Sequence, residues 1–286
     1  MKKYLLWIAA VILMLAAVFY QRVTGPTNPY RGKFYFDIQE YKYKLIRTQE
    51  TTDQAKIELP VPNIPKFDAT LHYKRFGTED SITSIPFVLQ GGTYYAKLPL
   101  QPSAGKMVYH VTLNANDKAF RIPEKEGEEI ILRYKDPVPL FVLIPHILFM
   151  FLGVLFGIRA GLSALFDPKT MRLWSLITLI SIIPGGLILG PIVQKYAFGA
   201  YWTGWPFGQD YTDNKMLVMW LVWVFVFIFA KWKLPEKEKI NRWLVGSATV
   251  VMLIMYLIPH SMGGSTLDYD KVDKGVHPKE AIKTGG

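Results

Sequence analysis

The sequence contains no cysteine among its 286 residues. Disulfide bonds, zinc–thiolate sites, iron–sulfur clusters and covalently attached c-type heme are therefore excluded, and any cofactor must be held without thiols. The sequence also lacks a nucleophile elbow, a phosphate-binding glycine loop and the paired carboxylates that soluble enzymes use. We therefore expect no independent catalytic activity.

Long apolar runs are abundant, although 20% of the residues are charged. Five runs without Asp, Glu, Lys or Arg each approach the roughly 20 residues that a helix needs to cross a bilayer. These runs are residues 4–20, 140–158, 173–193, 216–230 and 243–259. The fourth run is short and must borrow length from its flanks. The sequence therefore predicts an integral membrane protein with five transmembrane helices.

The basic residues predict the orientation of these helices. Lys2 and Lys3 precede the first run and no small-residue cleavage site follows it, which indicates an uncleaved signal anchor. The loops after the second and fourth runs are rich in lysine and arginine, as cytoplasmic loops are. Their basic residues are Arg159, Lys169, Arg172, Lys231, Lys233, Lys237, Lys239 and Arg242. We predict a cytoplasmic (inner) membrane protein with its N-terminus inside.

The formal net charge of +10 follows largely from these short loops, so it indicates topology and no nucleic-acid partner. Four parts are predicted: a transmembrane anchor over residues 1–29, an extracytoplasmic domain over 30–136, a four-helix transmembrane domain over 137–260, and a polar extracytoplasmic tail over 261–286. The tail has too few apolar residues to fold alone. Membrane lipid is the first expected partner.

Residues 33–135 change to a pattern of period two, which predicts strands. Turn signals divide this region into about seven short strands, as in a β-sandwich. The segments at 91–100 and 105–111 resemble the late strands of immunoglobulin-like or fibronectin type III modules. The predicted fold class is an α+β membrane protein: an extracytoplasmic Ig-like β-sandwich plus a helical bundle. His72 and His110 lie on these strands without a carboxylate or second histidine at metal-ligand spacing, so we assign them no role.

Two other histidines share one local sequence. His146 follows Leu-Ile-Pro near the start of the second run, and His260 follows Leu-Ile-Pro at the end of the fifth. With the predicted orientation, both lie near the outer membrane face. Each preceding proline leaves the backbone without one helical hydrogen bond. Pro184-Gly185-Gly186, with Gly190-Pro191, predicts a kink in the third run that lets neighbouring helices or a flat ligand approach.

The outer loop between the third and fourth runs is unusually aromatic. It contains Tyr201, Trp202, Trp205 and Phe207, followed by Asp210, Asp213, Asn214 and Lys215. Aromatic faces, polar groups for propionates and imidazoles for iron together suit a porphyrin. The same rings also suit an interfacial anchor, which is a common use of tryptophan and tyrosine. The acidic residues suit a Ca²⁺ site or, more simply, an N-cap at Asp213 or Asn214.

The order of histidine, tryptophan-rich loop and histidine resembles the heme-handling family of cytochrome c biogenesis, whose external loop ends in aspartate. Here the matching residues are Gly199-Ala200-Tyr201-Trp202, Trp205 and Asp210, although four residues separate the last two. The resemblance implies heme b with His146 and His260 as axial iron ligands. It also implies a platform of Trp202, Trp205 and Asp210, with cytochromes or other membrane or periplasmic proteins as partners.

Three functions remain open at this point. The first is a heme-binding membrane protein, for cytochrome maturation or b-type electron transfer. The second is a non-catalytic anchoring or assembly subunit that docks a partner through its Ig-like domain. The third, a transporter, has less support because few charges lie inside the predicted helices.

Overall fold

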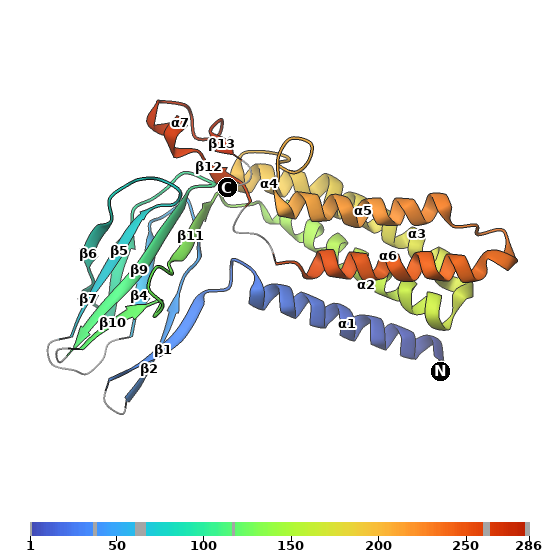
Figure 1. Ribbon diagram of the computed structural model, residues 1–286, viewed down its shortest axis with the longest axis horizontal. Helices are drawn as coiled ribbons and strands as arrows, with labels where there is room; N and C mark the ends of the chain where they lie inside the picture. The colour runs from blue at the N-terminus through green and yellow to red at the C-terminus, as the bar shows by residue number, and fades with distance from the viewer. Residues whose placement is uncertain (1, 37–38, 61–66, 116–117, 260–263, 284–286) are drawn as a thin grey trace. The chain divides into compact units, whose positions relative to one another are not determined.

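The computed structural model describes residues 2–36, 39–60, 67–115, 118–259 and 264–283. The chain divides into two compact units (Figure 1). The helical unit consists of Met1–Gly25, Val138–Tyr196 and Ala200–Gly264, and the β unit consists of Pro26–Pro137, Ala197–Gly199 and Ser265–Gly286. The protein is therefore of mixed α+β class, as predicted.

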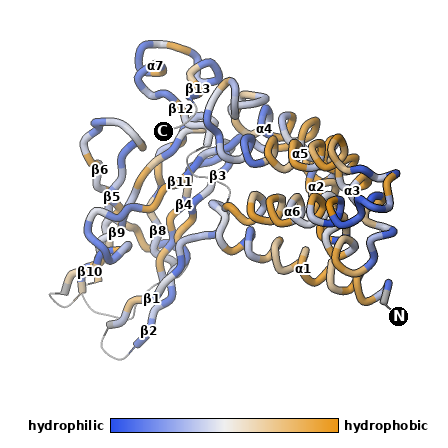
Figure 2. Tube along the Cα trace, turned by 45° about the vertical axis from the view of Figure 1, so that its right-hand side comes forward, coloured by the Kyte–Doolittle hydropathy of each residue, from blue (hydrophilic) through white to orange (hydrophobic). Residues whose placement is uncertain are grey.

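Apolar helices make up the helical unit and appear mostly orange in Figure 2. They are α1 (Lys2–Thr24), α2 (Leu140–Phe166), α3 (Pro168–Ile182), the π-helix η1 (Ile183–Leu189), α4 (Gly190–Phe198), α5 (Tyr211–Phe229), the short η2 (Pro235–Lys237) and α6 (Glu238–Leu257). Since α3, η1 and α4 run on as one segment, the described residues hold five segments long and apolar enough to cross a membrane. Each overlaps one of the five predicted runs.

A row of glycines on α2 explains how its neighbours approach so closely. Gly153, Gly157 and Gly161 are spaced four residues apart and therefore lie on one helix face. A Cβ on Gly161 would lie 2.6 Å from Thr249 Cγ2 on α6, and a Cβ on Gly153 would lie 3.0 Å from Ile182 at the end of α3. The Thr249 hydroxyl reaches the Gly157 carbonyl at 3.1 Å. Such small-residue rows are how apolar helices pack against each other.

Arg159 corrects one part of the sequence interpretation. It was expected in a cytoplasmic loop, but α2 continues to Phe166 and its guanidinium is fully buried. It lies 5.5 Å from the ring centroids of both Trp7 and Trp174 and hydrogen-bonds Ser163. The two aromatic faces compensate a charge that would otherwise be costly inside an apolar bundle. An uncharged run therefore underestimates the length of this helix.

The β unit contains more strands than predicted. Among the described residues, a large sheet has the order β3-β11-β9-β5-β6 with β10 beside β9, a small sheet has the order β4-β8-β7, and β1 and β2 form a hairpin. The strands are β1 (Tyr30–Phe36), β2 (Gln39–Leu45), β3 (Thr48–Glu50), β4 (Ala55–Leu59), β5 (Asp68–Arg75), β6 (Thr83–Pro86), β7 (Val88–Gln90), β8 (Thr93–Leu98), β9 (Lys106–Ala115), β10 (Lys118–Ile122) and β11 (Ile130–Lys135).

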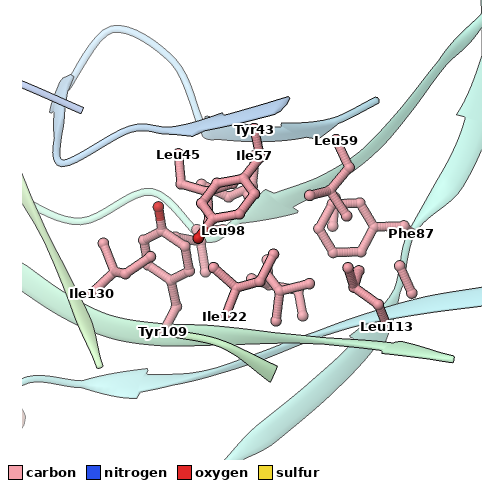
Figure 3. Packing of buried hydrophobic residues seen from close by; sticks show 14 of the residues in the cluster. Tyr43, Leu45, Ile57, Leu59, Phe87, Leu98, Tyr109, Leu113, Ile122 and Ile130 are labelled. Atoms are coloured by element: carbon pink, nitrogen blue, oxygen red, sulfur yellow. The ribbon is translucent and has the colours of Figure 1, made fainter. Parts of the chain in front are cut away.

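One hydrophobic core joins these sheets (Figure 3). Tyr43 and Leu45 of the hairpin and Ile57 of the small sheet pack with Tyr109 and Leu113 of the large sheet. The alternation that predicted strands matches this burial: in β4 every second residue is buried, from Ala55 to Leu59. The same period of two predicts that Phe34 and Ile38 share a buried face: Phe34 is buried, and Ile38 lies outside the described residues.

The polar tail folds with the β unit. It forms β12 (Thr266–Leu267), α7 (Tyr269–Asp273) and β13 (Ile282–Lys283), with Leu267 N–H donating to the Ala104 carbonyl at 3.0 Å. Arg75 binds the carboxylates of Asp80 and Asp273 with two hydrogen bonds each and stacks on Tyr269. These contacts join the tail to the β unit, and the tail adds a small hydrophobic cluster of its own, formed by Leu267, Tyr269 and Ala281.

Candidate functional site

His146 lies on α2 directly after Pro145 and is partly buried. Its Nδ1 is 2.8 Å from the carbonyl oxygen of Gly185. A carbonyl can only accept a hydrogen bond, so Nδ1 must carry the proton, and Nε2 of the neutral ring keeps its lone pair. Histidines that bind metals in proteins are commonly oriented in this way by a backbone carbonyl. The geometry thus leaves Nε2 as a potential ligand atom.

The carbonyl that orients His146 belongs to the π-helix η1. The same oxygen also accepts a hydrogen bond from the Gly190 N–H at the end of η1. Gly185 and Gly186 let two neighbouring helices approach: a Cβ on Gly185 would lie 2.9 Å from Phe149 Cβ on α2, and one on Gly186 would overlap Met216 on α5. The predicted close approach at this segment is confirmed. Short π-helices frequently occur at functional sites.

The aromatic loop between α4 and α5 is held by hydrogen bonds within itself. Trp202 Nε1 donates to the Trp205 carbonyl at 3.1 Å, and the Phe207 and Gly208 N–H groups donate to the Gly204 carbonyl at 2.9 Å. Trp205 is 68% exposed and Phe207 80% exposed. The loop is therefore a fixed structure that directs large aromatic rings outward.

Asp210 is the N-cap of α5, so the prediction of a cap at Asp213 or Asn214 is wrong. Its carboxylate accepts from the Thr212 N–H at 2.7 Å. The helix starts at Tyr211, earlier than its apolar run, because its polar first turn is satisfied by the loop. Asp213 Oδ2 accepts from the Thr203 N–H at 2.7 Å, and Asn214 Oδ1 accepts from the Trp205 N–H at 2.6 Å.

A cluster of polar side chains connects the loop to three helices; it comprises the partly buried Gln194 and the buried Thr203, Asp210, Asp213 and Lys215. Gln194 Nε2 on α4 donates to Thr203 Oγ1 at 2.6 Å. Both carboxylates have an oxygen within 3.3 Å of that hydroxyl. Lys215 Nζ donates to the Ile258 carbonyl, at the end of α6, at 2.7 Å. No periodic pattern in the sequence predicts Gln194 or Thr203 as hydrogen-bond partners of these charged side chains.

The polar cluster and His146 lie one turn apart along α4. A Cβ on Gly190 would lie 3.7 Å from His146 Cε1, and Gln194 follows Gly190 by four residues, about 6 Å along a helix. His260 lies outside the described residues, but Ile258, the partner of Lys215, precedes it by two positions. The structure thus brings His146 and the loop to neighbouring levels of the helical unit.

The predicted platform is only partly open. Trp205 is exposed and Trp202 is partly buried, whereas Asp210 is 5% exposed and its oxygens already accept from Thr212 and Thr203. Within the described ranges, no three His, Asp or Glu side chains are grouped to hold a metal ion. The carboxylates of this loop therefore serve the cap and the polar cluster, and nothing in their grouping favours Ca²⁺.

His72 and His110 are closer to other titratable groups than their sequence spacing indicated. They face each other on β5 and β9 with ring centroids 4.7 Å apart, and His110 Nδ1 lies 3.5 Å from Glu129. Burial lowers the pKa of both histidines, and the charge of Arg121 lowers both further. His72 is hydrogen-bonded to Ser84 and Thr112 through its two ring nitrogens, at 2.7 and 2.8 Å. Strand pairing, invisible in the sequence, creates this pair.

Comparison with known proteins adds no assignment. No protein-family model matches the chain. No curated protein gives a significant match to it.

Proposed function

We propose that this protein binds heme b in its helical unit, with His146 as one axial ligand of the iron. The observation that carries the proposal is the hydrogen bond from His146 Nδ1 to the Gly185 carbonyl, which fixes the ring and leaves Nε2 with a lone pair. In the described part of the chain, no hydrogen bond is made to Nε2. His260 is the proposed second ligand.

The aromatic loop fits this role through its rings. Trp202 and Trp205 supply flat apolar surface for the porphyrin, and hydrogen bonds within the loop and to Asn214 on α5 keep that surface preformed. Asp210 contributes by holding the start of α5 and the loop together, because its carboxylate is buried. Bound heme would supply one-electron transfer or be carried as a passenger for cytochrome maturation.

The proposed site lies near the outer face of the cytoplasmic membrane, with the N-terminus inside. Two observations support this. The tail after α6 belongs to the same unit as the strands that precede α2, so both must lie on one side of a membrane. An even number of crossings between them meets this condition, and α2 to α6 contain four segments long and apolar enough to cross. The basic residues of η2 and of the start of α6 favour a cytoplasmic position for the end of the helical unit that is formed by the loop between α5 and α6. The chain has no cysteine of its own, so single cysteines at Thr52 and Lys233 can be labelled from either side to test this.

Heme titration tests the proposal. We expect detergent-purified wild-type protein to develop a Soret band with added hemin. His146→Ala should lose the band or shift it, whereas His277→Ala, an exposed histidine in the β unit, should behave as wild type. Identical spectra for wild type and His146→Ala would exclude His146 as a ligand.

A second candidate is a non-catalytic anchoring subunit that docks a partner through its β unit, in the manner of an Ig-like module. Exposed apolar residues on and beside the edge strands favour it, namely Ile82, Val88 and Leu89. A partner that co-purifies in mild detergent and is lost with Leu89→Asp, but kept with Leu100→Asp, would support docking here. Purification as a lone monomer would contradict it.

A further inference from the structure

The β1–β2 hairpin has two chemically different faces. Phe34, Tyr41, Tyr43 and Leu45 are buried in the core of the β unit. The residues between them point to the other side and are exposed: Arg31 and Lys33 on β1, and Lys42 and Lys44 on β2. We call these four residues the basic face of the hairpin. The alternation of the strands therefore places four cations on one surface.

The strand register sets these cations against each other. Arg31 is directly opposite Lys44, and Lys33 is directly opposite Lys42. Like charges in directly opposed positions destabilise a sheet. Glu40 offsets part of the charge, at 2.8 Å from Lys33 and 3.6 Å from Lys42. Within the described residues, no ion pair joins Arg31 or Lys44 to a carboxylate. The face thus repels itself and would gain from an anionic partner.

The position of the hairpin in the chain limits what that partner is. α1, which is long and apolar enough to cross a membrane, ends at Thr24, and β1 begins at Tyr30. The five intervening residues span at most roughly 18 Å when fully extended. The start of the hairpin therefore stays close to the lipid surface that α1 leaves. A tether of this length keeps headgroups at high local concentration, whereas a soluble anion would have to be recruited.

We propose that the basic face of the β1–β2 hairpin binds anionic phospholipid headgroups at the membrane surface from which α1 emerges. Clusters of four or more basic residues beside a membrane span are attracted to anionic lipid in this way. The exposed Tyr35, whose ring lies 5.3 Å from Lys33 Nζ, adds an amphipathic ring suited to the interface. This inference depends on α1 spanning the membrane and is independent of heme.

Lipid-dependent fluorescence tests the proposal in the full chain. Because the sequence has no cysteine, Gln39→Cys, near the hairpin turn, gives a single site for an environment-sensitive dye. The labelled protein is placed in nanodiscs of phosphatidylcholine alone or of phosphatidylcholine with phosphatidylglycerol. We expect a blue shift and lower access to an aqueous quencher with the anionic lipid. The effect should weaken at 1 M salt, where screening shortens to about 3 Å.

A matched pair of variants separates this face from charge in general. The variant Arg31→Gln/Lys33→Gln/Lys42→Gln/Lys44→Gln should lose the lipid response. Each charge removed should lower the bound-to-free ratio on the order of fivefold. The control Lys56→Gln/Lys97→Gln removes another exposed, directly opposed pair, on β4 and β8, and should keep it. The four-residue variant should melt no lower than wild type, because it removes repulsion.

Three results would overturn the proposal. One is equal fluorescence in neutral and anionic nanodiscs. Another is a lipid response that survives in the four-residue variant or disappears in the control. The third is no response to lipid together with a response to soluble heparin, which would assign the face to a soluble polyanion.

Discussion

Replacing Tyr269 by phenylalanine should loosen the β unit from its C-terminal end. The Tyr269 hydroxyl accepts from the Lys106 N–H at 3.1 Å and lies 3.0 Å from the Lys106 carbonyl and 3.1 Å from Gln101 Oε1. Lys106 is fully buried. Removing the hydroxyl takes this hydrogen bond away from a buried N–H, which costs about 1–3 kcal/mol. We take about 2 kcal/mol as the expected loss, or roughly a 30-fold change in an opening equilibrium.

Hydrogen exchange of β9 in the full-length protein measures this loss, because exchange from a cooperative unit follows its opening free energy. Tyr269→Phe should accelerate exchange in β9 and in the tail by that factor. Tyr95→Phe is the control: its hydroxyl donates to the exposed side chain of Gln90, so we expect a change within about 0.5 kcal/mol. Unchanged exchange in Tyr269→Phe would refute the conclusion that the tail belongs to the β unit, and with it the argument for an even number of crossings.

Two further predictions concern helix packing and pH. Gly161→Leu should lower the free energy of unfolding of the helical unit by about 1–3 kcal/mol, because the new side chain would overlap Thr249. Gly246→Leu is the control and should not lower it, because there is open space around Gly246. Unfolding of both variants can be followed by tryptophan fluorescence. Because folding lowers the pKa values of His72 and His110, the unfolded state binds more protons below about pH 6.5. The histidine contribution to the stability of the β unit is therefore fully present above that pH and is lost as the pH falls through the folded pKa values. His110→Gln should make stability depend less on pH in this range. An unchanged pH profile in His110→Gln would contradict the contribution of this histidine.

The sequence predicts those features that depend on local pattern. The five apolar runs correspond to helical segments because crossing a bilayer demands length and hydrophobicity, which are visible in one dimension. The alternation in β4 likewise predicts its buried face. Helix ends were predicted less well: α2 extends past Arg159, and α5 begins before its apolar run, at Tyr211. In both cases tertiary contacts hold a charged group that the pattern alone treats as a helix boundary: the rings of Trp7 and Trp174 face Arg159, and Thr203 donates to Asp213.

Features that depend on pairing between distant segments were not predictable. His72 and His110 meet because β5 and β9 align in one register, and Asp213 meets Thr203 because the loop folds back on α5. The bond from His146 to Gly185 joins two helices and requires a π-helix whose exact form sequence cannot give. The sequence does carry one signal of helix packing: glycines at 153, 157 and 161 are spaced as in closely packed membrane helices.

The absorption spectrum of the purified full-length protein, recorded oxidised and reduced after expression with ample heme, tests the central claim most directly. If His146 binds heme b through Nε2, the protein should show a Soret band that sharpens and shifts on reduction, and His146→Ala should alter it. A colourless protein that also fails to acquire a Soret band with hemin would contradict heme binding altogether.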